Sequence, residues 1–166
     1  QLSAKERSGL EVKNLSADMK MTPQGMAFNN LDLRTNNSQI RNYFSMSYND
    51  MSEMGNFLHK VKMAAVFDDS YIDSDDIAFF APGMASWDKK IALKGKVRGT
   101  VDDLVGKDML LQAGNNTLLN GDISMSGLPD INQTFIDFKA NEFRTVYTDA
   151  VQIVPAIRRI KNPDVS

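Results

Sequence analysis

The sequence predicts a mainly β protein: an elongated, curved, antiparallel and repetitive sheet that forms an apolar groove, with one or two short helices. Three observations predict it. Asp and Asn, which favour turns, make up 31 of the 166 residues. Short runs between them alternate apolar and polar side chains, as strands with one buried face do. A set of short motifs also occurs twice, which indicates an internal repeat.

The alternation is clearest over residues 91–101. Its odd positions carry Ile, Leu, Val and Gly, whereas Lys94, Lys96 and Arg98 stand at even positions. Because successive side chains of a strand point to opposite faces, this segment has one apolar and one basic face. Shorter runs of the same kind lie at residues 44–49, 119–126 and 136–140, and the Gly-Asn-Asn-Thr stretch at 114–117 predicts a tight hairpin.

Residues 63–67 are apolar at every position, so we expect a strand whose second face is covered by another element. Two short helices are candidates for this cover. One is predicted from residue 75 to 81, capped by Asp73 or Ser74 and stopped by Pro82. The other is predicted from Thr148 or Asp149 to about residue 160, with an interruption at Pro155.

The repeat pairs residues 36–40 with 115–119 and residues 45–47 with 124–126, both at an offset of 79. Phe57 then matches Phe135, and residues 67–77 match residues 143–153 at an offset of 76. These matches predict one β unit over residues 1–82 and a second over residues 83–160, each ending in a short helix. Residues 161–166 are expected to be a linker, and the whole chain a fragment of a larger protein.

Composition excludes several classes of function. The chain is 42% hydrophobic and 24% charged, with a net charge of −2, so no basic surface for nucleic acid is expected. It has no Cys, so thiolate metal sites are excluded, and its one His, His59, leaves few residues for a Ser–His–Asp triad. We expect no enzyme activity, no cofactor and no metal, although a glycosidase based on scattered carboxylates is a remote alternative.

Three patterns have both a structural and a functional interpretation. The acidic residues at 68–76 are turn and cap carboxylates or, without the spacing of a calcium loop, a weak cation site. Gly95 and Gly99 either allow close packing within a strand or leave room for a ligand. Lys94, Lys96 and Arg98 form either a solvated basic stripe or a contact for phosphate headgroups.

Three segments carry a resemblance to a known family. Residues 93–104 read LKGKVRGTVDDL, residues 116–131 read NTLLNGDISMSGLPDI and are followed by TFID at 134–137, and residues 77–82 read IAFFAP. They are similar to recurrent elements of the TamB/AsmA-like translocation and assembly module proteins of Gram-negative envelopes. The resemblance covers about residues 72–150, and the first seventy residues enter it only through the repeat.

This resemblance implies a section of a long protein that is anchored in the inner membrane and crosses the periplasm. Its body would be a curved β-sheet, taco-like in section, with an apolar inner surface. The resemblance further implies roles in phospholipid movement and, through an outer-membrane barrel partner, in outer-membrane protein assembly. This segment itself is expected to be soluble and periplasmic.

The alternation and the resemblance together predict a non-enzymatic β-groove that shields phospholipid acyl chains. An alternative from another class is a closed β-sandwich, a surface or adhesion module whose apolar faces pack on each other. The predicted lipid-groove residues are Leu93, Val97, Leu119, Ile123, Met125, Ile136 and Phe138 in the second unit, and Phe44, Met46 and Tyr48 in the first.

Overall fold

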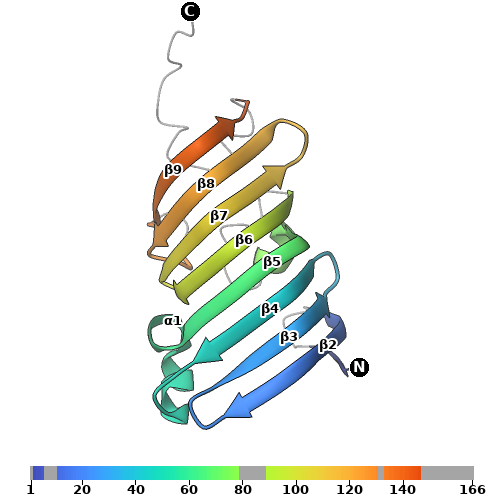
Figure 1. The fold of residues 1–166 in the computed structure, drawn as a ribbon, viewed down its shortest axis with the longest axis vertical. Helices are drawn as coiled ribbons and strands as arrows, with labels where there is room; N and C mark the ends of the chain where they lie inside the picture. Colours follow the sequence, from blue (N-terminus) through green and yellow to red (C-terminus); the bar gives the residue numbers. More distant parts are fainter. Residues whose placement is uncertain (1, 6–10, 79–88, 131–132, 147–166) are drawn as a thin grey trace, which may run out of the picture.

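The structure is a computed structural model that describes residues 2–5, 11–78, 89–130 and 133–146. In this part of the chain, nine strands form one antiparallel sheet, and each strand pairs with its neighbours in sequence (Figure 1). The strands are β1 (Leu2–Lys5), β2 (Glu11–Thr22), β3 (Gly25–Arg34), β4 (Gln39–Ser47), β5 (Lys62–Asp73), β6 (Lys90–Thr100), β7 (Asp103–Ala113), β8 (Thr117–Ser126) and β9 (Phe135–Arg144). The sheet is open, and the prediction of a mainly β, antiparallel architecture is confirmed.

Helices in the described residues are short and lie at strand ends. A 3-10 helix, η1 (Met51–Asn56), and α1 (Phe57–Lys60) connect β4 to β5, and α2 (Ser74–Ala78) follows β5. The Asp73 carboxylate accepts the Asp75 N–H at 3.0 Å, which confirms the predicted cap, and the helix begins at Ser74, one residue before the predicted start. Its predicted end and the second predicted helix, at 148–160, lie outside the described residues. No helix in the described part has the length and apolar character to cross a membrane.

The same strand register occurs twice in the sheet, in β2–β5 and in β6–β9. Ser16 pairs with Asp32 and Asp18 with Asn29 in the first half; 78 residues later, residues 94 and 96 pair with residues 110 and 107. The same one-residue bulge therefore recurs at the same place. In the next pair of strands, Phe44 is opposite Phe28 and Ile123 is opposite Gly106, which confirms the predicted offset of 79.

The predicted offset of 76 in the last strand of each unit is wrong. Met63 is opposite Met46, and Ile136 is opposite Met125, so β5 and β9 correspond at an offset of 73. Phe67 thus corresponds to Ala140 rather than to Phe143. The connections before these strands explain the difference. The β4–β5 connection contains η1 and α1, whereas the β8–β9 connection is shorter. Phe57 and Phe135 likewise fall in different elements, a helix and a strand.

A line of irregular residues crosses the middle of the sheet. The register shifts inside every neighbouring pair of strands. Near this line, backbone φ is positive at one residue in each of β3 to β8, at Asn30, Asn42, Asp69, Gly95, Asp108 and Gly121; Gly99, closer to the end of β6, also has a positive φ. A bulge bends its strand and increases its twist, so bulges aligned from strand to strand bend the whole sheet along one line. This alignment gives a physical basis for the predicted curvature.

The sheet is a single layer in the described residues. Extensive contacts between strands are confined to sequence neighbours, and the helices make their main contacts with the sheet where α1 meets β6 and α2 meets β5. Within the described residues, no helix or strand packs extensively over the second face of residues 63–67. The end of the first helix predicted to cover it and the whole second helix lie outside the described residues, so this expectation stays a prediction. Ala64 and Val66 are half-buried among their cross-strand neighbours, Ser45 and Tyr43.

Candidate functional site: the apolar face of the sheet

Cross-strand register assigns each side chain to one of the two faces of the sheet, because directly opposed residues point to the same side. One row of opposed residues runs through all strands from β2 to β9, and a second runs beside it. The first is Met19, Phe28, Phe44, Ala65, Val97, Gly106, Ile123 and Phe138; the second is Met21, Met26, Met46, Met63, Gly99, Leu104, Met125 and Ile136. Apart from three glycine and alanine positions, these rows hold only large apolar side chains.

The apolar character continues beyond the bulge line. Leu93, Leu111, Leu119 and Phe143 form a third row across β6–β9, and Leu15, Leu33 and Ile40 lie on the same side of β2–β4. We call the surface made by the three rows and these β2–β4 residues the apolar face. It extends across eight strands without a charged side chain in any of these positions. The opposite surface, which we call the polar face, carries most of the charged residues.

Nine of the ten residues predicted to line a groove lie on the apolar face. They are Phe44, Met46, Leu93, Val97, Leu119, Ile123, Met125, Ile136 and Phe138. Tyr48 is the exception, because β4 ends at Ser47 and the Tyr48 N–H donates to the Gln24 carbonyl at 3.0 Å. Tyr48 is 6% exposed, and its backbone is bonded to the β2–β3 turn, beyond the last residue of β4.

Sequence reasoning missed the contribution of β2 and β3. Met19, Met21, Met26 and Phe28 complete the two long rows, and Phe28 stacks on Phe44 with 6.3 Å between the ring centroids. The signal was present, since Met19 and Met21 alternate with Asp18, Lys20 and Thr22. The turn at residues 23–24 joins two such runs and hides the change of strand.

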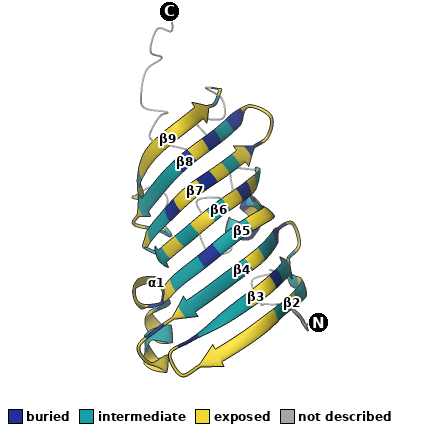
Figure 2. Cartoon of the chain, viewed as in Figure 1, coloured by how far each residue is buried: buried dark blue, intermediate teal, exposed yellow. Residues whose placement is uncertain are grey.

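The apolar face is buried in its middle and exposed at both ends. Leu93 and Leu119 are 7% and 4% exposed, whereas Met19, Met21, Phe138 and Phe143 range from 42% to 62%. Figure 2 shows the same trend, with β9 and the end of β2 largely exposed. Large apolar patches left open to solvent are typical of surfaces that bind a ligand or a partner.

The glycines of the central motif serve packing within the sheet. A Cβ atom at Gly95 would lie 2.6 Å from the Met109 sulfur and 2.8 Å from the Asp108 carbonyl oxygen, and the Gly95 φ of +133° disfavours any other residue. Gly121 has a φ of +153°, and a Cβ there would meet the backbone of β9. The close-packing interpretation of Gly95 therefore holds, because the neighbouring strand already occupies the space that a ligand would need.

The remaining candidates from the sequence have structural partners. In the acidic segment, Asp68 pairs with Lys94 at 2.9 Å, Asp69 pairs with Arg41, and Asp76 is buried among the hydroxyls of Thr35 and Ser38. No group of three acidic, His or Cys side chains in the described residues can hold a metal ion.

His59 pairs with Asp102 and connects α1 to the β6–β7 turn. The Asp102 N–H also donates to the Leu58 carbonyl oxygen at 3.3 Å. Hydrogen bonds from Thr100 and from His59 lower the pKa of the Asp102 carboxyl below its ordinary value. These contacts give the only histidine of the sequence a role in joining two parts of the fold.

Comparisons of this chain with protein-family models, with curated proteins and with solved structures found no match. The family resemblance of its motifs therefore rests on the residues alone.

Proposed function

We propose that this chain is a non-enzymatic lipid-shielding segment, in which the apolar face contacts the acyl chains of phospholipids. One observation carries the proposal: an uninterrupted apolar face across eight strands is left half-exposed by a single open sheet. A closed sandwich would bury this surface against a second sheet, and no second sheet exists among the described residues.

The mechanism is passive. Each methylene group moved from water onto apolar side chains contributes about 0.8 kcal/mol. The rows run across the strands and offer many equivalent contacts, so an acyl chain has no single preferred position along them. Met side chains at five positions of the second row are flexible and polarisable, which suits contact with acyl chains of varied shape. Weak contacts of this kind allow a lipid to move along the surface.

The cellular setting follows from the resemblance to the TamB/AsmA-like family. We place the segment in the periplasm, within a parent protein anchored in the inner membrane, where it supports phospholipid transfer or, through a barrel partner, outer-membrane protein assembly. The bulge positions support this assignment, since Gly95 and Gly121 of the matching motifs have positive φ at the line where the sheet bends. The motif glycines thus have a physical role in the curvature that the family resemblance implies.

The test is native mass spectrometry of the 166-residue chain incubated with a palmitoyl lysophospholipid, which carries one acyl chain. We expect bound lipid on the unsubstituted chain and its loss on Met125→Asp, because the carboxylate lies in the second apolar row. Ser124→Asp is the matched control, since it introduces the same charge at the next residue on the polar face.

Circular dichroism and urea unfolding identify variants that remain folded. Retention of lipid by a folded Met125→Asp variant, or equal loss with Ser124→Asp, would contradict the proposal. Ile123→Asp repeats the test in the first row, and Lys94→Ala on the polar face, where Asp68 already neutralises the charge, should leave the bound lipid unchanged.

A further inference from the structure

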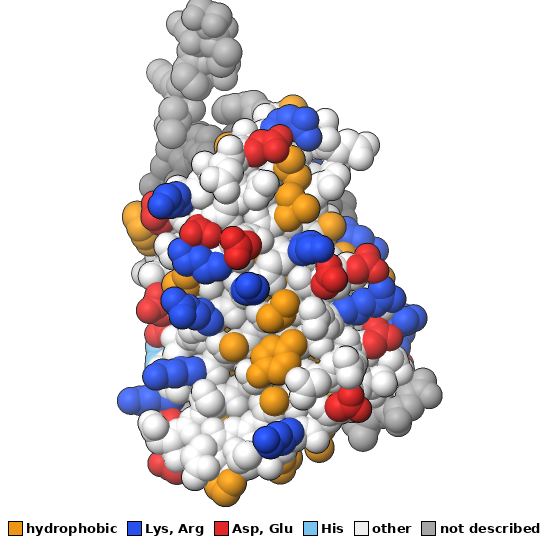
Figure 3. Space-filling view, viewed as in Figure 1, with side chains coloured by type: hydrophobic (Ala, Val, Ile, Leu, Met, Phe, Trp, Pro, Cys, Tyr) orange, Lys and Arg blue, Asp and Glu red, His pale blue; other side chains and the backbone are white. Residues whose placement is uncertain are grey.

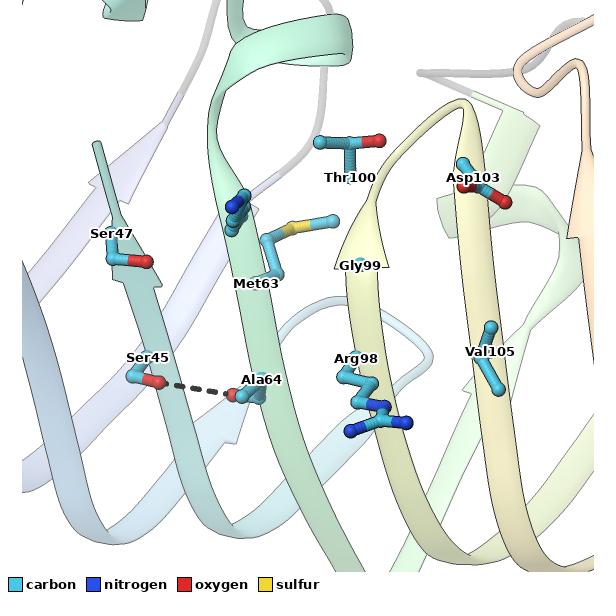
Figure 4. Close-up of a pocket in the computed structure, with 10 residues that line it drawn as sticks. Ser45, Ser47, Met63, Ala64, Arg98, Gly99, Thr100, Asp103 and Val105 are labelled. Atoms are coloured by element: carbon cyan, nitrogen blue, oxygen red, sulfur yellow. Dashed lines mark hydrogen bonds between the residues drawn. The ribbon is translucent and has the colours of Figure 1, made fainter. Parts of the chain in front are cut away.

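The polar face contains a depression of about 430 Å³ at the ends of the central strands β4–β7 (Figure 4). Two rows of opposed residues form its surface. The inner row is Ser45, Ala64, Arg98 and Val105, and the outer row is Ser47, Lys62, Thr100 and Asp103. Ser45 and Ala64 are short, so they form a floor between the longer side chains of Lys62 and Arg98.

The two cations of the depression, Lys62 and Arg98, differ from four other cations of the polar face. On the polar face, Arg34 pairs with Asp32, Arg41 with Asp69, Lys94 with Asp68 and Lys107 with Asp122. Among the described residues, neither Lys62 nor Arg98 forms an ion pair. Figure 3 shows the charged side chains of this face on either side of a narrow hydrophobic strip.

Positive charge is further concentrated beside the depression. Lys96 lies two residues from Arg98 on the same face of β6, and it is directly opposite Lys107 of β7. Like charges at opposed positions of neighbouring strands repel each other. Asp122 neutralises Lys107 at 2.6 Å, which leaves Lys62, Lys96 and Arg98 without a carboxylate. Asp103 is the one acidic side chain of the depression, and it lies on β7, beyond Thr100 from Lys62.

We propose that the depression binds a phosphate group between Arg98 and Lys62. The guanidinium of Arg presents a planar fork of donors that matches two oxygens of a phosphate, and Lys supplies a second point charge. The Ser47 hydroxyl, at the rim beside Lys62, is a further donor. The ligand is either a phosphomonoester in solution or the phosphate of a lipid headgroup, and both present the same chemistry to these residues.

This site opens on the side of the sheet opposite the apolar face, although Met63 and Gly99 of the second apolar row contribute to its lining. Ala64 and Ala65 are adjacent in β5 and point to opposite sides of the sheet, one into the depression and one into the first apolar row. A phosphomonoester without an acyl chain therefore tests the depression alone, and its result does not depend on lipid binding on the other face.

The experiment is a titration of the ¹⁵N-labelled 166-residue chain, followed by NMR. The first probe is glycerol 3-phosphate, and the second is vesicles of phosphatidylglycerol in phosphatidylcholine, compared with phosphatidylcholine alone. We expect saturable shifts of amides in residues 45–47, 62–64 and 98–100 with the first probe, or binding to the anionic vesicles with the second. Arg98→Ala should weaken either response about tenfold, since hydrogen bonds between charged groups are the strong ones.

The variants separate this site from general attraction to positive charge. Lys94→Ala is the matched control, because it removes one cation from the same face of the same strand, where Asp68 already neutralises it. Arg98→Lys should retain part of the affinity, since it keeps the charge and loses the fork. Equal weakening by Lys94→Ala and Arg98→Ala would overturn the proposal, as would the absence of any response to both probes.

Discussion

The two halves of the sheet, β2–β5 and β6–β9, share a register but differ in how each holds its bulges. The bulge positions with positive φ are Asn30, Asn42 and Asp69 in the first half, and Gly95, Asp108 and Gly121 in the second. Asn and Asp tolerate this region of backbone conformation, and Gly adopts it without a steric penalty. The bulge is thus kept while the residue that forms it changes, which shows that the bulge and not its residue type is the repeated feature.

The halves differ also in what supports their ends. The first half has η1 and α1 between its last two strands, and it is followed by α2, whose Asp76 reaches the β3–β4 hairpin. The last strand of the second half, β9, is exposed at nine of ten positions. Three changes test these differences, given from the largest expected effect to the smallest.

The largest effect is expected at the equivalent bulge positions Gly121 and Asn42. Gly121→Ala should lower the free energy of unfolding by about 3 kcal/mol, because the added methyl group would lie 2.7 Å from the Ala140 Cα at a φ that side chains rarely adopt. Position 42 already accommodates a side chain, so Asn42→Ala should lower the free energy of unfolding by only about 1 kcal/mol. Urea unfolding of both variants measures the difference. Equal losses of unfolding free energy would contradict the expectation that position 121 excludes a side chain whereas position 42 accepts one.

A smaller effect is expected at the hairpin ends. The Asp76 carboxylate is buried and accepts hydrogen bonds from Thr35, from Ser38 and from the Asn37 N–H. Asp76→Ala would remove the acceptor shared by these three donors, of which Ser38 is buried, and should cost about 2 kcal/mol.

The second half provides the comparison for Asp76. There Thr117, the equivalent of Ser38, contacts the Thr145 hydroxyl at 2.9 Å. Thr145→Ala should cost less than about 1 kcal/mol, because a neutral hydroxyl pair at a partly exposed site contributes less. Unfolding in urea and amide hydrogen exchange of residues 35–40 measure both changes. A larger loss for Thr145→Ala would contradict the interpretation that α2 is the main support of the first half.

The sequence was sufficient to predict which face of each strand is apolar, and insufficient to predict the bulges. Alternation in residues 91–101 predicted the apolar side of β6 because each position depends only on its neighbours. The same reasoning failed at Tyr48, where the strand ends and the parity loses its meaning. It also failed at residues 67–77, because the offset of 76 assumed that Phe67 and Phe143 keep one register through loops of different length.

The bulges could not be predicted from the sequence, for a different reason. Asn30, Asn42 and Asp108 are polar residues that sequence analysis assigns to turns, yet each lies inside a strand of nine to eleven residues. Only the pairing with a neighbouring strand distinguishes a bulge from a turn. The depression near Arg98 depends on the same long-range information, since its floor and its cations come from β4, β5 and β6.

The smallest effect concerns a side-chain contact between the two halves, beside the β5–β6 pairing. Asp102 follows β6, and its carboxylate joins His59 of α1, which lies between β4 and β5 of the first half. Its pKa is lowered in the folded chain, by hydrogen bonds from Thr100 and His59, so its ionised form stabilises the fold above the unfolded pKa of about 4. This stabilisation is lost as the pH falls through the folded pKa.

The unsubstituted chain should therefore lose stability more steeply than Asp102→Asn on acidification below about pH 5. The urea midpoints of both chains are measured across this pH range. The other carboxylates are the same in both chains, so the difference between the two curves reports on Asp102. Parallel pH curves would mean that α1 is held to the β6–β7 turn by the backbone hydrogen bond between Asp102 and Leu58 alone.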